Sequence, residues 1–224
     1  MTRSFVRAIV VIGALLPTPA LAQTRPAPGS TREFTVGGLW LGPASFGSAS
    51  ADLLRPDGTP LTVFEAENSL GPGIGLQAGM AFRLTPSVWT EITAGWSRAS
   101  LRTTITGDVE NADVEPIRAR VMRVSLEASA LWYVHPRGST SWFVRGGGGW
   151  AKELAEGNAL AEDAFSATGG AGVRHWWREG RRSKVQRMGL RIEFRADLRS
   201  GGITLGGSGL RLSPGAAGHV VLGF

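Results

Sequence analysis

Residues 187–199 read RMGLRIEFRADLR, and apolar and polar side chains alternate through the whole stretch. The even positions carry Met, Leu, Ile, Phe, Ala and Leu, whereas every odd position except Gly189 carries a charged side chain. A helix would spread these charges around its circumference, but a β-strand places them all on one face. Residues 122–133, MRVSLEASALWY, repeat the pattern. The period predicts strands with one apolar and one polar face.

Weaker alternation in six further segments brings the predicted number of strands to eight. The predicted strands are 33–42, 73–84, 87–98, 122–133, 141–152, 164–177, 187–199 and 211–224. Short connections at 85–87, 135–140 and 178–185 alternate with long ones at 43–72, 99–117, 153–163 and 200–210. Short turns at one end and long loops at the other are typical of outer-membrane barrels. We therefore predict an all-β fold, an eight-stranded antiparallel up-and-down transmembrane β-barrel.

The tryptophans favour a membrane barrel over a soluble one. Five of the eight Trp lie on the apolar face near strand ends, as expected for the two aromatic girdles of a membrane barrel. The members near the short turns are Trp132, Trp142 and Trp177, and those at the opposite end are Trp96 and Trp150. Trp89 and Trp176 have the other parity and fit the girdles less well.

The polar faces carry charges in the middle of the strands. An arginine facing the middle of the bilayer would cost about 2–4 kcal/mol, so this face must line the lumen of a membrane barrel. Four basic and four acidic residues alternate there, which allows them to pair as buried charges require. The predicted lumen network is Glu91, Arg123, Glu127, Arg145, Arg191, Glu193, Arg195 and Asp197. A charged outer face of a soluble barrel would explain strand 187–199 equally well.

The N-terminus has the features of a secretory signal peptide. Arg3 and Arg7 precede an apolar run at 8–16, and Ala20-Leu21-Ala22 fits a cleavage site. The predicted organisation is a signal peptide at 1–22, a flexible lead-in at 23–32 and the barrel at 33–224. Export followed by barrel insertion predicts the bacterial outer membrane as the location.

The composition excludes several classes of function. The 224 residues contain no Cys, which excludes disulfides and thiolate metal sites. The 32 Gly show no collagen period; inside strands they relieve crowding in a tightly curved barrel. The basic residues are divided among lumen, rim and turns, so no single basic face exists for nucleic acid. We predict no cofactor, no metal and no nucleic-acid partner.

The histidines do not indicate an enzyme. His135 and His175 are predicted at the short-turn end, and His219 has inward parity, where it could hydrogen-bond within the lumen. No His-x-Ser pair is present, so we predict that the chain is not an enzyme.

Charged residues near the long loops suggest contacts outside the barrel. Acidic residues gather in two of these loops: Asp108, Glu110, Asp113, Glu115, Glu153, Glu156, Glu162 and Asp163. Four basic residues have lipid-side parity just beyond the outer Trp level, where they suit lipopolysaccharide phosphates: Arg98, Arg118, Arg120 and Lys152. Simple snorkelling of these side chains to the interface is an equal alternative.

The final strand carries a family resemblance. It ends at Phe224, with Leu222 and Val220 on the same face. With eight strands, long loops and a signal peptide, this ending resembles the small outer-membrane barrels typified by the OmpA transmembrane domain, OmpX and OmpW. The resemblance implies that Val220, Leu222 and Phe224 form a signal for the barrel assembly machinery, and that outer-membrane lipids surround the chain.

The resemblance also bounds the function. A structural or adhesive role with the outer loops as the interaction surface is favoured, because eight strands leave a lumen mostly filled by side chains. A narrow channel, or OmpW-like transport of small apolar solutes, is the alternative. A lipid A-modifying enzyme is less favoured. The sequence does not name an extracellular partner.

Overall fold

The structure of the chain is a computed structural model. It describes residues 30–55, 57, 59–106, 117–134, 138–155, 161–179, 185–201 and 210–224. The predicted signal peptide at 1–22 and most of the lead-in at 23–32 lie outside the described residues. No helix among the described residues is long and apolar enough to cross a membrane.

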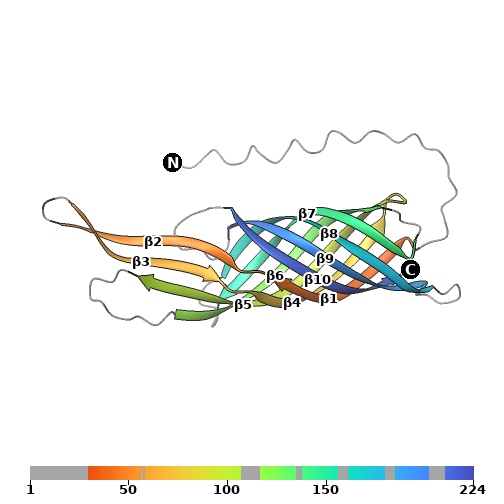
Figure 1. Ribbon diagram of the computed structural model, residues 1–224, viewed down its shortest axis with the longest axis horizontal. Helices are drawn as coiled ribbons and strands as arrows, with labels where there is room; N and C mark the ends of the chain where they lie inside the picture. The colour runs from red at the N-terminus through yellow and green to blue at the C-terminus, as the bar shows by residue number, and fades with distance from the viewer. Residues whose placement is uncertain are drawn as a thin grey trace, which may run out of the picture.

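Among the described residues, eight strands form a closed antiparallel ring (Figure 1). In chain order they are β1 (Arg32–Leu41), β4 (Gly73–Arg83), β5 (Val88–Thr106), β6 (Ile117–Val134), β7 (Thr140–Ala155), β8 (Ala161–Glu179), β9 (Arg187–Gly201) and β10 (Arg211–Gly223). Each strand pairs with its neighbour in this order, and β1 pairs with β10 to close the ring. The eight-stranded antiparallel barrel predicted from the alternation is therefore confirmed.

The expected loop at 43–72 is instead a hairpin of β2 (Ala44–Leu54) and β3 (Pro60–Leu70). The strand pairing joins β3 to the far part of β5, from Glu65 opposite Thr106 to Leu70 opposite Leu101. The hairpin extends well beyond the barrel in Figure 1. Its first strand, ASFGSASADLL, is dominated by small and polar side chains, so it lacks the regular apolar period by which the other strands were recognised.

The expected loop at 99–117 is also shorter than predicted. β5 continues to Thr106 and β6 begins at Ile117, so only 107–116 lie outside the described residues. We call the end of the barrel that bears the β4–β5, β6–β7 and β8–β9 connections the turn end, and the opposite end the loop end.

Burial alternates along the strands as the sequence period requires. In β9, Arg191 and Glu193 are fully buried in the lumen, whereas Ile192 and Phe194 between them are 43% and 70% exposed on the outer wall. Closing a pleated sheet into a ring sends alternate side chains inward and outward. The outer wall is therefore apolar, which is the surface a lipid bilayer requires.

Adjacent glycines in β7 show why this barrel needs residues without a side chain. Gly147 faces the lumen, where an added Cβ would lie 2.5 Å from the carbonyl oxygen of Ala128. Gly146 faces outward, and an added Cβ there would meet nothing within 4 Å. The close approach of β6 to β7, rather than chain flexibility, thus requires glycine at 147.

Candidate functional site

The middle of the lumen is filled by paired charges, with Arg145 of β7 at the centre. Its guanidinium donates hydrogen bonds to Glu193 at 2.7 Å and to Glu127 at 2.6 Å. It also donates to the hydroxyl of Ser129 at 3.0 Å. A third carboxylate, that of Glu91, lies 3.9 Å away. One arginine therefore contacts carboxylates from β5, β6 and β9.

Two arginines of β9 extend this network. Arg191 lies 2.8 Å from Glu91, which also accepts a hydrogen bond of 3.3 Å from Thr35. Arg195 is 3.2 Å from the second carboxylate oxygen of Asp197 and 3.8 Å from Glu127. The contacts of Arg191 with Glu91 and of Arg195 with Glu127 run between strands that are not neighbours in the ring, so they tie different walls of the barrel together.

The structure places all eight predicted lumen charges in the interior. Seven of them form ion pairs within 4 Å: Arg145, Arg191, Arg195, Glu91, Glu127, Glu193 and Asp197. Arg123 is buried as well, but it forms no ion pair with any described residue.

A second ion pair, which the sequence reasoning missed, closes the turn end. Arg174 of β8 donates a hydrogen bond of 2.5 Å to Glu33 of β1. Its guanidinium also lies over aromatic rings, 3.9 Å from the ring centroid of Tyr133 and 4.8 Å from that of Trp176. Arg174 could have been recognised from the sequence. It is an even number of residues from Thr168, so in an extended strand the two side chains lie on the same face.

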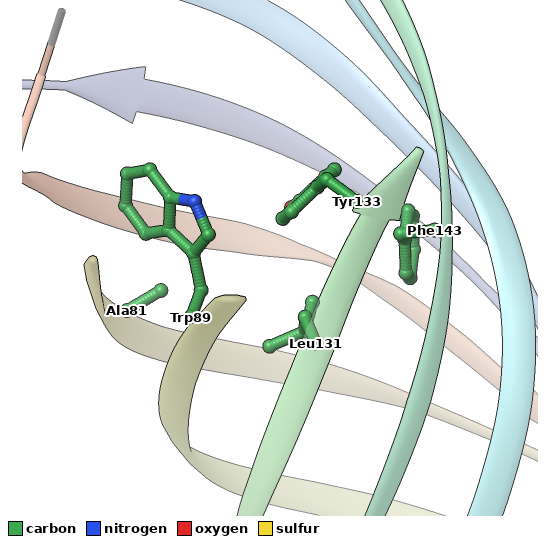
Figure 2. Close-up of a cluster of buried hydrophobic side chains, with 5 residues drawn as sticks. All are labelled: Ala81, Trp89, Leu131, Tyr133 and Phe143. Atoms are coloured by element: carbon green, nitrogen blue, oxygen red, sulfur yellow. The ribbon is translucent and has the colours of Figure 1, made fainter. Parts of the chain in front are cut away.

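Figure 2 shows a buried cluster of aromatic and aliphatic side chains, and the Arg174 guanidinium lies over the rings of two of its members, Trp89 and Tyr133. Trp89 and Tyr133 pack edge to face with ring centroids 6.2 Å apart, and Tyr133 lies 5.4 Å from Phe143. Leu131 and Ala81 complete this buried cluster. Trp89 and Trp176, the two tryptophans with polar parity, are thus part of the lumen lining, each 4% exposed.

The loop end of the lumen combines one ion pair with an apolar layer. Glu153, which the sequence placed in an acidic loop, lies instead in β7, is buried and pairs with Arg199 of β9. Ala44, Leu70 and Val121 pack together nearby. The reason for the error is that β7 continues to Ala155, so Glu153 retains the inward parity of the strand.

Of the other acidic residues predicted in loops, some lie in a strand and the rest lie outside the described residues. Glu162 and Asp163 belong to β8. The remaining ones, Asp108, Glu110, Asp113, Glu115 and Glu156, lie outside the described residues.

The histidines do not form a catalytic arrangement in the described residues. His175 shares a hydrogen bond of 2.8 Å with the hydroxyl of Thr140 at the exposed turn end. His219 is buried in the lumen, as its inward parity predicted, and neither ring nitrogen has a hydrogen-bond partner among the described residues. His135 lies outside the described residues. No group of His, Asp and Glu among the described residues is arranged to hold a metal ion.

The outer wall carries the predicted girdle tryptophans. All five point outward, with exposed fractions from 38% to 66%: Trp96, Trp132, Trp142, Trp150 and Trp177. Trp132 and Trp142 lie at the turn-end portions of β6 and β7, and Trp150 lies toward the loop end of β7. The apolar wall between the two levels is suited to the hydrocarbon layer of a bilayer.

The four basic residues proposed from parity also point outward. Arg98, Arg118, Arg120 and Lys152 are exposed on β5, β6 and β7. The guanidinium of Arg98 lies 5.9 Å from the ring centroid of Trp96, so it sits beside the outer girdle. The strand register adds Arg102, which lies opposite Arg118. These residues form a basic belt just beyond the outer tryptophans.

The last strand closes the ring through its backbone. Phe224 donates a backbone hydrogen bond of 2.9 Å to Arg32, and its carbonyl accepts one of 3.0 Å from Thr31. The side chains of Val220 and Phe224 point outward, 38% and 40% exposed, and Leu222 is half-buried. Of the predicted assembly signal, Val220 and Leu222 therefore lie in β10, and Phe224 follows that strand directly at the β10–β1 seam.

The chain is similar to known proteins in its structure but not in its sequence. No protein-family model matches the chain, and no curated protein sequence matches it significantly. Neisserial surface protein A is similar in structure at 10% sequence identity, covering 88% of this chain and 100% of that one, with a TM-score of 0.49.

Two further solved structures are similar at comparable identity. Ail, the attachment invasion locus protein of Yersinia pestis, in complex with the heparin analogue sucrose octasulfate, has 10% identity and a TM-score of 0.44 and covers 86% of this chain and 97% of its own. The outer membrane protein AlkL in lipid bilayers has 13% identity and a TM-score of 0.38, covering 90% and 92%.

The architecture follows from the chain's own geometry. A closed antiparallel barrel satisfies its backbone hydrogen bonds without free edges, and its outer wall is apolar between two levels of tryptophan. This is the construction of a small outer-membrane β-barrel. The predicted fold class, an eight-stranded antiparallel barrel, is confirmed.

Proposed function

We propose that the chain is a structural and adhesive outer-membrane barrel whose β2–β3 hairpin, together with the long loops, forms its interaction surface. The observation that supports this proposal is the difference between the lumen and the hairpin. The lumen is filled by ion pairs between an aromatic cluster and an apolar layer, whereas the hairpin projects beyond the ring of strands.

The filled lumen argues against a pore as the main role. Arg145, Glu127 and Glu193 meet within hydrogen-bonding distance at its centre, and their side chains are almost fully buried. Buried charges held by several partners are costly to separate. A solute would have to break this network to cross the barrel.

The hairpin supports adhesion because it presents apolar side chains to water. Leu53 and Leu54 near its tip are 62% and 78% exposed, and Phe64 is 38% exposed. Exposed apolar groups beyond the membrane mark a contact surface. Between the two strands, the hydroxyl and backbone N–H of Thr59 donate hydrogen bonds to the carboxylate of Asp57, which lowers the pKa of that carboxyl.

The test compares attachment of cells that express the protein with and without the apolar tip. The double substitution Leu53→Ser with Leu54→Ser removes apolar area at the tip. Attachment of these cells to one another and to a solid surface should fall toward that of cells lacking the protein. The amount of heat-modifiable barrel in the outer membrane should stay unchanged.

Leu84→Ser is the matched control, because Leu84 is 66% exposed at the turn end. It should leave attachment unchanged. Equal attachment of wild-type cells and cells lacking the protein would refute the adhesive role. Large, ion-selective current steps of the purified wild-type barrel in a planar bilayer would favour transport instead.

We further propose lipopolysaccharide phosphates as the ligands of the basic belt. Guanidinium groups suit phosphate oxygens, and Arg98 of the belt lies beside the outer-girdle residue Trp96. Reversal of Arg98, Arg118, Arg120 and Lys152 to Glu should reduce the lipopolysaccharide that co-purifies with the barrel. Unchanged co-purification would mean that these side chains only snorkel to the interface.

A further inference from the structure

Arg123 of β6 is a buried charge without a dedicated partner. It is 8% exposed and forms no ion pair within 4 Å with a described residue. Two acids attract it, Asp197 first and then Glu127, and each already has a closer cation: Asp197 lies 3.2 Å from Arg195 and accepts a hydrogen bond of 3.2 Å from Thr168, and Glu127 lies 2.6 Å from Arg145. A buried guanidinium left uncompensated is strongly unfavourable. Something other than Asp197 alone is needed to balance it.

A small cavity lies against this guanidinium. The cavity has a volume of about 20 Å³. Its charged lining consists of Arg123, Arg199 and Glu153, and Ser97 and Ser213 add hydroxyl groups. Arg199 is held there by its ion pair with Glu153. The lining therefore carries two positive charges and one negative charge.

The remaining walls of the cavity are apolar. Leu41, Leu70 and Val121 line it toward the loop end, where the last two belong to the apolar layer. Electrostatic attraction is stronger in such a dry environment than in water. An anion inside the cavity would thus be attracted strongly by the guanidinium groups.

We propose that this cavity is a binding site for one monovalent, monatomic anion of the size of chloride, held by Arg123 and Arg199. One such ion neutralises the excess charge of the lining. A water molecule needs roughly 10–15 Å³ of such space, so the cavity has room for one single-atom ion larger than water. A cavity this small favours a single-atom anion over a tetrahedral oxyanion or a carboxylate ligand.

The bound anion would act as a structural counter-ion inside the barrel. It completes the charge balance at the loop end of the lumen, as Glu33 does for Arg174 at the turn end. A ligand that binds the folded state alone raises the free energy of unfolding. Chloride should therefore stabilise the folded barrel.

The experiment measures urea unfolding of the purified full chain in lipid vesicles, with sodium chloride, bromide or gluconate at the same ionic strength. The wild-type midpoint should be higher in chloride and bromide than in gluconate, which is too large for the cavity. Arg123→Gln should abolish this difference. Arg32→Gln, which replaces an exposed arginine of β1 at the turn end, should retain the full difference.

Two results would overturn the proposal. One is a wild-type midpoint that does not distinguish chloride from gluconate, and the other is a full chloride effect in Arg123→Gln. If Arg123→Gln does not fold, crystals of the wild-type protein grown in bromide decide the matter. An anomalous bromide peak in contact with the guanidinium of Arg123 supports the site, and its absence refutes it.

Discussion

Arg174 and Glu33 meet across the turn end of the lumen, where the guanidinium donates a hydrogen bond of 2.5 Å to a carboxylate 141 positions earlier in the chain. The pair joins β8 to β1, which are not neighbours in the ring. Rings of Tyr133 and Trp176 shield it from water. It therefore braces the barrel across its diameter as well as closing its turn end.

The Arg174→Met substitution should destabilise the barrel by about 3–5 kcal/mol, because it leaves the Glu33 carboxylate buried without its partner. The quantity to measure is the free energy of unfolding in urea, with the protein in lipid vesicles. Arg32→Met, which removes an exposed arginine of β1 at the same end, should cost far less. Equal losses for the two variants would show that the buried pair has no special role.

Arg145 is the residue whose loss should open the lumen. The Arg145→Ala change deprives Glu127 and Glu193 of their closest cation and removes the bulk that fills the centre. The excess of carboxylates should attract cations. In planar bilayers we expect cation-selective current steps from Arg145→Ala and none of comparable size from the wild type or Arg145→Lys. Silent recordings from correctly folded Arg145→Ala would contradict the assignment of Arg145 as the plug.

Gly146 and Gly147 provide a test of backbone approach within two adjacent residues. In Gly147→Ala, the new methyl group would lie 2.5 Å from the Ala128 oxygen and 2.6 Å from the Ser129 Cβ. Such overpacking typically costs about 1–3 kcal/mol. Gly146→Ala, with open space around the new methyl group, should be nearly neutral in the same urea experiment. A similar cost at both positions would point to a general need for flexibility instead.

The terminal aromatic should matter for assembly more than for stability. Phe224→Ala removes an outward side chain but keeps the backbone hydrogen bonds to Thr31 and Arg32. We expect less barrel in the outer membrane of living cells, with refolding of the purified protein into vesicles almost unchanged. Phe34→Ala removes the same side chain from β1 and should assemble normally. Normal assembly of Phe224→Ala would exclude the proposed signal.

Much of the barrel was predictable because its information is local. Alternation in 187–199 and 122–133 indicated both the strands and the direction of each side chain, since a strand reverses its face at every residue. The hairpin β2–β3 was missed because recognition of a strand depended on regular alternation. The strand pairing of the hairpin has register shifts near Ser45–Ser48 and Ala51–Asp52, and its first strand is dominated by small and polar side chains, so no regular apolar period is present. Glu153 was misplaced because the end of a strand cannot be read from its parity.

The sequence predicted that charges in the lumen form ion pairs, but not which residues pair with each other. Equal numbers of inward acids and bases implied ion pairs, and Glu193 and Arg145 are indeed such residues. The sequence could not show that Arg145 contacts three carboxylates, nor that Arg123 contacts none within 4 Å. Partners 48 and 141 positions apart are set by how far each strand is shifted along its neighbour.

The sequence by itself determined the number of barrel strands, the face that each side chain takes and the apolar wall between two levels of tryptophan. These follow from the two-residue period of an extended chain and from the cost of placing charge in lipid. The tertiary structure decided which charges meet, where the cavity beside Arg123 lies and that the β2–β3 hairpin extends β5. These depend on the tilt and stagger of the closed ring, which bring residues together from strands far apart in the chain.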